Sequence, residues 1–188
     1  MKVKKYIAAA VLIVSLVVPA LKVEAAAQQT ISEEQLIEYT EEIGQQYGIC
    51  PELLQAIAER ESGLRIYATN GSCKGLMQIS EKWHRDRMER LGVKDIYDAY
   101  GNILLAADYI AELAEENEDL YYVLMRYNMA KSTADKLYAA GEYSDYAVDI
   151  VERSAELERL HERERFKKQY APEGVDHDRG RQKNSGHT

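Results

Sequence analysis

Residues 51–63 read PELLQAIAERESG, the pattern of an amphipathic helix with its own start and stop signals. Pro51 suits the first helical position, and Gly63 suits the left-handed position that ends a helix. The predicted buried face consists of apolar residues at helical spacing, namely Leu54, Ile57 and Ala58. One turn further, the same face carries Glu61. The predicted polar side carries Glu52, Gln55 and Glu59.

Glu61 is a carboxylic acid at a position that disfavours its charge. It continues the apolar face and lies in the last turn of the predicted helix, where the helix dipole and the free carbonyl groups repel negative charge. Desolvation and the dipole both raise a carboxyl pKa, which allows the protonated form to act as a general acid. The alternative is a glutamate at the edge of the core, paired with Arg65 or Arg85.

The chain around this segment has mostly helical periodicity. A capping box at Ser32 and Gln35 predicts a first helix over about 33–46. Residues 67–79 differ, because Asn-Gly-Ser turn chemistry and the short apolar run Leu76–Ile79 predict a loop with a small strand or hairpin. With no repeat and no βαβ alternation, the predicted class is mostly α with a small β element. Further helices are expected over about 81–91, 102–116, 119–127, 131–140 and 144–165.

Composition excludes several function classes. The chain has 188 residues, a length that suits one domain, and its net charge of −8 argues against a nucleic-acid partner. The four histidines and two cysteines show no metal-ligand spacing, and no glycine-rich phosphate loop is present. We therefore expect no metal and no cofactor.

The two ends of the chain differ from its middle. Residues 1–27 have a lysine-rich start, an apolar run from Ile7 to Val18 and then small alanines, which predicts a secretory signal peptide; an uncleaved membrane anchor is the alternative. Residues 28–160 form the predicted domain. Residues 161–188 are predicted to be a charged helix end and a disordered tail. Export would place the chain where a disulfide persists.

Three motifs follow one another in the chain: Glu61-Ser62-Gly63, Gly75-Leu76-Met77-Gln78-Ile79 and Tyr127-Asn128. In this order and spacing they resemble the lytic transglycosylases of the lysozyme superfamily, which cleave peptidoglycan strands. The resemblance covers roughly residues 43–160. It implies a lysozyme-like α+β domain with many short helices and a small β element near the active-site cleft.

The resemblance also implies a role for individual residues. Glu61 would be the sole catalytic acid and base, and Ser62 would support its carboxylate. Substrate contacts are implied for residues on the floor and walls of the cleft, namely Thr69, Gly75, Met77, Gln78, Tyr127, Asn128 and Tyr146. The chain departs from the family pattern where Thr69 replaces a serine, Ser80 a methionine and Ala130 a glycine, and where Ser72-Cys73-Lys74 replaces a Gly-Ala pair.

Together with the export signal, the resemblance implies a secreted enzyme that cuts the β-1,4 bond between N-acetylmuramic acid and N-acetylglucosamine and leaves a 1,6-anhydro ring. Two alternatives stay open. A goose-type lysozyme would use water and a second carboxylate, with Asp86, Asp95 and Asp98 as unassigned candidates. A non-catalytic wall-binding protein would keep the cleft without turnover. The expected partners are peptidoglycan strands and a secretion or conjugation machine, and the chain is expected to be a monomer.

Cys50 and Cys73 are predicted to form a disulfide. Both belong to a chain with an export signal, one directly precedes the helix of Glu61, and the other lies in the loop that leads to Gly75. Such a bridge would hold the cleft floor against that helix. The alternative is two buried, unpaired cysteines.

Overall fold

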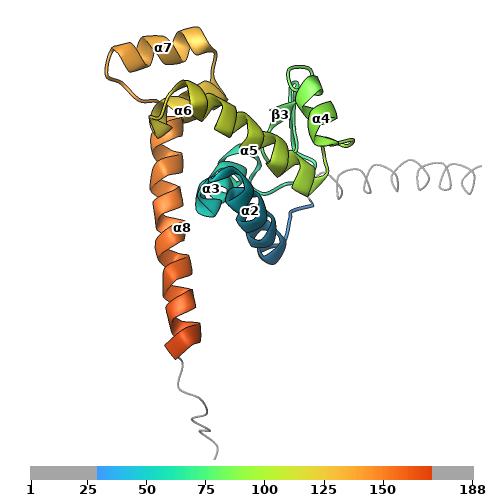
Figure 1. Cartoon of the computed structure of the whole chain (residues 1–188), viewed down its shortest axis with the longest axis vertical. Coiled ribbons are helices and arrows are strands. Elements are labelled where there is room, and N and C mark those ends of the chain that lie inside the picture. The colour runs from blue at the N-terminus through green and yellow to red at the C-terminus, as the bar shows by residue number, and fades with distance from the viewer. Residues whose placement is uncertain (1–28, 171–188) are drawn as a thin grey trace, which may run out of the picture.

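The computed structural model describes residues 29–170, which contain helices α2 to α8 and one small sheet (Figure 1). The predicted signal peptide and the predicted tail beyond residue 170 lie outside the described residues. The mostly helical class with a small β element is confirmed. The helices are α2 (Glu33–Tyr47), α3 (Pro51–Ser62), α4 (Arg85–Leu91), α5 (Ala99–Glu116), α6 (Leu120–Asn128), α7 (Lys131–Ala139) and α8 (Asp145–Tyr170).

Helix α3 lies in the middle of the molecule, and its predicted apolar face is fully buried at Leu54, Ile57 and Ala58. It packs against α2 on one side and α8 on another. The expectation of a solvated polar side is wrong for Glu52 and Gln55, which are buried. Gln55 donates a hydrogen bond to Thr40 on α2 (2.9 Å), and Glu52 pairs with His161 on α8 (2.9 Å). The polar side of α3 can be buried because α2 and α8 supply hydrogen-bond partners for Gln55 and Glu52.

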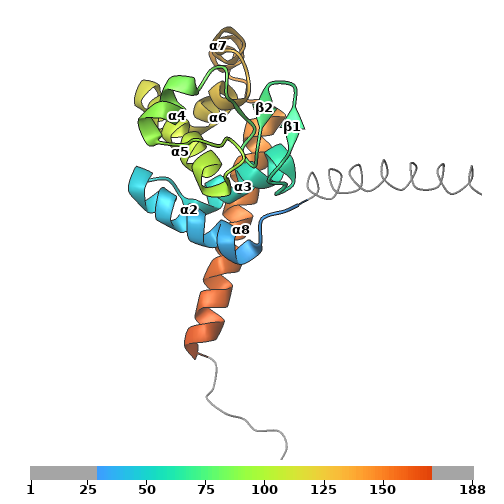
Figure 2. The ribbon, with the colours of Figure 1, turned by 90° about the vertical axis from the view of Figure 1, so that its right-hand side faces the viewer.

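The sheet consists of three two-residue antiparallel strands in the order β1-β2-β3, namely Thr69–Asn70, Cys73–Lys74 and Ile79–Ser80. A two-residue turn at 71–72 joins β1 to β2, as the Asn-Gly-Ser sequence predicts. The apolar run Leu76–Ile79 is not a strand: only its last residue is in β3, and the residues before it form a turn. Figure 2 shows the hairpin beside α3.

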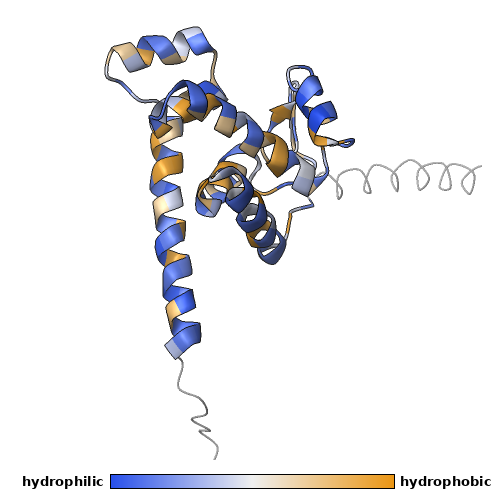
Figure 3. Cartoon of the chain, viewed as in Figure 1, coloured by the Kyte–Doolittle hydropathy of each residue, from blue (hydrophilic) through white to orange (hydrophobic). Residues whose placement is uncertain are grey.

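Three predicted helix boundaries shift in the structure. Helix α4 begins at Arg85 instead of 81, because residues 81–84 form a turn, and α5 begins at Ala99, where the Asp98 carboxylate caps it. Helix α8 continues to Tyr170, and its second half runs past the rest of the domain (Figure 1) and is largely hydrophilic (Figure 3). Within residues 29–170, no helix combines the length and the apolarity that crossing a membrane needs.

Candidate active site

Glu61 lies in the last turn of α3, and its carboxyl group faces the first turn of α8. There Tyr146, which is 9% exposed, donates a hydrogen bond from its hydroxyl to Glu61 Oε1 at 2.6 Å. The two residues are 85 positions apart in the chain. Neither arginine of the alternative pairing binds the Glu61 carboxyl in the structure; Arg65 instead donates from Nε to the Ser62 carbonyl at 2.8 Å.

The environment of Glu61 favours its protonated form. Burial raises the pKa of the Glu61 carboxyl above its ordinary value, and this effect exceeds the opposing effects of the Tyr146 hydrogen bond and the Arg60 charge. Glu61 is partly exposed, so its protonated form can meet a ligand. These are the properties of a general acid. The pKa of Tyr146 is raised by burial and by the neighbouring Tyr127 and Glu61, so its hydroxyl stays a hydrogen-bond donor.

Tyr127, near the end of α6, binds the predicted cleft floor. Its hydroxyl donates to the Met77 carbonyl at 2.7 Å. Burial and, to a smaller extent, the nearby charges of Glu61, Tyr109 and Cys73 raise the Tyr127 pKa. Hydrogen bonds therefore join two pairs of predicted site residues, Glu61 to Tyr146 and Tyr127 to the Met77 backbone. Met77 is fully buried in the core, and its backbone N–H and carbonyl bind Asn102 and Tyr127, so the substrate contact predicted for Met77 does not match the structure.

The turn formed by residues 75–78 is held by Asn102, a fully buried polar residue of α5 that sequence analysis missed. Asn102 Oδ1 accepts from the Met77 N–H at 2.7 Å, and its amide group donates to the carbonyls of Ile96 (2.9 Å) and Lys74 (3.2 Å). Gly75 has a φ of +80°, and an added Cβ would lie 2.6 Å from the Asn102 side chain. The close approach that requires glycine here is therefore to Asn102. An amide within an apolar helical run was the only signal for it.

Gln78 follows in the same turn, in a left-handed conformation with a φ of +49°. Its Nε2 donates to the carbonyls of Gly75 (2.9 Å) and Ala68 (3.2 Å), which stabilises this uncommon backbone conformation. The amide nitrogen is therefore occupied by the backbone. The other polar atom of this side chain, Oε1, has no hydrogen-bond partner among residues 29–170. Oε1 is therefore the atom of Gln78 that remains for a ligand.

Three of the predicted substrate contacts, Gln78, Tyr127 and Asn128, line one cavity of about 630 Å³. We call it the side cavity. Its other walls include residues that the motif pattern had not identified, namely Trp83, His84, Arg87, Tyr109, Glu112 and Arg126. Trp83 is the only tryptophan of the sequence and is 75% exposed. A single exposed tryptophan beside the turn was a signal that sequence analysis did not use.

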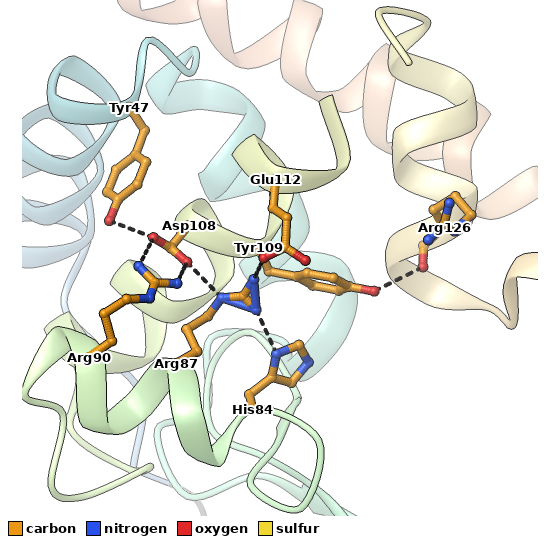
Figure 4. Close-up of polar contacts among 8 residues, drawn as sticks. All are labelled: Tyr47, His84, Arg87, Arg90, Asp108, Tyr109, Glu112 and Arg126. Carbon is orange, nitrogen blue, oxygen red and sulfur yellow. Dashed lines mark hydrogen bonds and ion pairs between the residues drawn. The ribbon is translucent and has the colours of Figure 1, made fainter. Parts of the chain in front are cut away.

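A polar network forms the wall of the side cavity between α4 and α5 (Figure 4). Arg87 is 8% exposed and binds Asp108 (Nε to Oδ2, 2.7 Å) and Glu112. Arg90 binds the same Asp108 carboxylate with two hydrogen bonds, which together with Arg87 hold the Asp108 pKa below its usual value. The network ties α4 rigidly to α5 and so shapes this wall.

The roles predicted for Ser62 and Thr69 do not match the structure either. Ser62 is buried, and its hydroxyl donates to the Ala58 carbonyl at 3.1 Å, not to the Glu61 carboxylate. Consecutive helical residues point about 100° apart, which directs Ser62 away from its neighbour. Thr69 is exposed on β1, and its Oγ1 lies 2.9 Å from the Tyr97 hydroxyl, away from the residues that line the side cavity.

The predicted disulfide is absent, and both cysteines are free thiols. Cys50 precedes the first turn of α3, where its Sγ donates to Glu52 at 3.2 Å. Cys73 lies on β2 and lines the side cavity. The two thiols thus belong to different parts of the fold, one at the start of α3 and the other in the hairpin.

Of the four carboxylates considered as assistants of Glu61, three have other partners. Asp98 caps α5 by accepting from the Gly101 N–H at 2.7 Å, and Asp95 accepts from the Tyr97 N–H at 2.9 Å. Glu112 lines the side cavity but is bound by Arg87. Asp86 lies in the first turn of α4 and does not line this cavity. Within residues 29–170, no group of three or more His, Cys, Asp or Glu side chains could hold a metal ion.

Comparisons with known proteins agree with this arrangement. The family model described as "Transglycosylase SLT domain" matches residues 38–147, which include Glu61, the turn 75–78, Tyr127 and Tyr146. A similar solved structure is that of an inactive glutamate-to-glutamine mutant of the lytic transglycosylase Slt from Pseudomonas aeruginosa. It matches with a TM-score of 0.50 and 16% identity, over 63% of this chain and 21% of that one. The likeness shows a shared fold. A search of curated proteins found no match.

Proposed function

Because the chain belongs to the transglycosylase SLT domain family, we propose that it is a peptidoglycan lytic transglycosylase. It cleaves the β-1,4 bond between N-acetylmuramic acid and N-acetylglucosamine and forms 1,6-anhydro-N-acetylmuramic acid. The observation that carries the proposal is the Glu61 carboxyl group, whose pKa is raised by burial and which Tyr146 holds at 2.6 Å.

The proposed reaction uses Glu61 twice. The protonated carboxyl group first donates its proton to the glycosidic oxygen, which leaves with the bonding electrons. The N-acetyl group of the substrate stabilises the positive charge at the anomeric carbon. The Glu61 carboxylate, now stabilised by the Tyr146 hydroxyl, then removes the proton of the muramyl 6-hydroxyl, whose oxygen closes the anhydro ring. The proton returns to Glu61, so one carboxyl group completes the cycle.

The partners of three candidate second acids support this non-hydrolytic route. Hydrolytic glycosidases ordinarily need a second carboxylate within about 5 to 9.5 Å of the acid. Glu112 is bound by Arg87, while Asp95 and Asp98 bind backbone N–H groups. A hydroxyl within the bound sugar needs no such base of its own, because it is already held next to the reacting carbon.

We further propose that the enzyme acts outside the cytoplasm, because residues 1–27 have the pattern of a secretory signal or an uncleaved anchor. Its substrate there would be the glycan strands of the cell wall.

Digestion of purified peptidoglycan tests the function, with products identified by mass spectrometry. We expect muropeptides that end in 1,6-anhydro-N-acetylmuramic acid, about 18 mass units lighter than hydrolysis products because one water is missing. Glu61→Gln should lower turnover by about 10²- to 10⁴-fold while the protein stays folded. Glu41→Gln, an exposed change on α2, is the matched control and should keep full activity. Reducing ends would indicate a lysozyme, and binding without release would indicate a wall-binding protein.

A further inference from the structure

His84 is a wall residue of the side cavity that the proposed reaction does not use. It directly precedes α4 and follows Trp83, which lines the same cavity. Its ring stands edge-on to the Tyr109 ring, with 4.7 Å between the ring centroids. The Arg87 guanidinium group also lies over the Tyr109 ring, with 5.0 Å between its Cζ atom and the ring centroid. The imidazole is therefore held in one orientation by its neighbours.

The contact with Arg87 determines where His84 carries its proton. Arg87 Nη1 lies 3.0 Å from His84 Nδ1, and Arg87 also binds Asp108 and Glu112 (Figure 4). A guanidinium group has only donors, so Nδ1 must be the acceptor and must be unprotonated. The proton of the neutral ring is then on Nε2.

The Nε2–H group is available to a ligand. Figure 4 shows this nitrogen on the side of the ring away from Arg87. Among the hydrogen bonds of residues 29–170, His84 uses only Nδ1 in its side chain. Burial and the adjacent positive charge of Arg87 lower the His84 pKa, against the opposing effect of Glu112, so the ring stays neutral. His84 thus presents one fixed, uncharged donor on the wall of the cavity.

The charges around His84 indicate which part of a substrate can bind there. The two arginines of the cavity wall are neutralised, Arg87 by Asp108 and Glu112, and Arg126 by Glu116 at 2.8 Å. No lining cation is therefore left without an acidic partner. Glu112 would also repel an anion. An acidic peptide stem or another anionic polymer is disfavoured, whereas an uncharged oxygen of a sugar fits a neutral N–H donor.

We infer that His84 is a substrate-binding residue whose Nε2–H donates a hydrogen bond to an uncharged oxygen of an N-acetylated glycan in the side cavity. Arg87 is its positioning residue, because it fixes the tautomer and the direction of the ring. The inference rests on the proposed function for the identity of the ligand. It extends the binding surface from Tyr127 and Gln78 to the start of α4 and assigns specificity for neutral sugar groups to that end.

The direct test is the binding of chitotetraose, a neutral chain of four N-acetylglucosamine units, followed by the fluorescence of Trp83. All variants carry Glu61→Gln to prevent turnover. His84→Phe keeps a planar ring but removes the donor, and we expect about three- to tenfold weaker binding. In His84→Gln the amide can accept from Arg87 and donate into the cavity, so affinity should stay within about twofold. Glu89→Gln, an exposed change on α4, is the control and should bind normally.

Unchanged affinity in His84→Phe would overturn the inference, as would equal weakening in His84→Phe and His84→Gln. If His84→Phe does not fold, nitrogen NMR of the histidine-labelled Glu61→Gln chain decides. The His84 ring should be the Nε2–H tautomer, and its signal should move when chitotetraose is added; the other tautomer or an unmoved signal contradicts us. Wall digestion by the native chain is measured separately. If the chain binds chitotetraose through His84 but does not cleave the wall, only the proposed function is refuted.

Discussion

Two opposite influences act on a single carboxyl group at the centre of the site. Burial raises the Glu61 pKa, and the hydrogen bond from Tyr146 lowers it. The first keeps the proton available for the leaving oxygen, and the second stabilises the carboxylate once that proton has gone. The balance between them sets the pH range in which Glu61 can act as an acid.

Tyr146→Phe should therefore shift the pH dependence of the reaction in a defined direction. Removing the hydroxyl removes an interaction that favours the charged carboxylate, so the Glu61 pKa should rise further. The protonated acid then persists to higher pH, and the alkaline limb of kcat/KM should move upward while the maximum falls. The measurement is wall digestion across a pH series. Tyr143→Phe, whose hydroxyl binds Asp119 instead, should leave the limb in place; a downward shift in Tyr146→Phe would contradict the assignment.

At the scale of elements, the turn 75–78 owes its shape to α5. Asn102 binds the backbone before, within and beyond this turn, and its side chain fills the space next to Gly75. The motif that resembles a sugar-binding floor is thus also a packing motif between the hairpin and a helix. Its backbone reaches Tyr127 through the Met77 carbonyl.

Two glycine substitutions separate backbone strain from this packing. Gly71 and Gly75 both have positive φ, at +59° and +80°, but a Cβ at Gly71 would meet nothing within 4 Å. Gly71→Ala should therefore cost about 1–2 kcal/mol of unfolding free energy, from the left-handed conformation alone. Gly75→Ala should cost a further 1–3 kcal/mol or so, because the methyl group overlaps Asn102. Urea unfolding measures both, and equal losses would contradict the close contact.

At the scale of the whole molecule, α8 connects the site to the far end of α3. Its first turn carries Tyr146, which binds Glu61, and later turns carry Arg153 and His161. Arg153 binds Glu59 with two hydrogen bonds (2.6 and 3.0 Å), and His161 binds the buried Glu52. The predicted domain boundary at residue 160 therefore divides a helix whose next residue contacts α3.

His161→Ala should lower the free energy of unfolding by about 1–3 kcal/mol, because the buried Glu52 carboxylate loses a partner. Burial alone would raise the Glu52 pKa, but the hydrogen bonds from His161, Cys50 and its own backbone lower it. Because the Glu52 pKa is lowered in the folded protein, the ionised carboxylate stabilises the fold at pH values above 4.5, the ordinary pKa of this group. This stabilisation is lost as the pH falls through the lowered pKa. Thermal or urea unfolding at neutral and acidic pH should show the difference shrinking with acid. Glu158→Ala, an exposed change on the same helix, should alter stability by under about 0.5 kcal/mol.

Features that depend on neighbouring residues could be predicted from the amino-acid order. Helical spacing and the flanking Pro51 and Gly63 predicted α3 and put Glu61 at its end, and the Asn-Gly-Ser turn predicted the hairpin. Together with the three motifs, this was enough for the fold class and the family. Local spacing determines these features because it decides which residues share a face.

The partners of each helix face depend on how the helices pack against one another. Periodicity marked Glu52 and Gln55 as polar but could not show that α8 and α2 bring partners that bury them. It could not pair Glu61 with Tyr146 across 85 residues, place Asn102 beneath the turn, or bring His84 into the cavity of Tyr127. The disulfide prediction failed for the same reason, because closeness to the same motifs in the sequence does not show whether two thiols meet in the fold. Such contacts depend on how whole elements pack, and that packing is decided by the combined burial of all their faces.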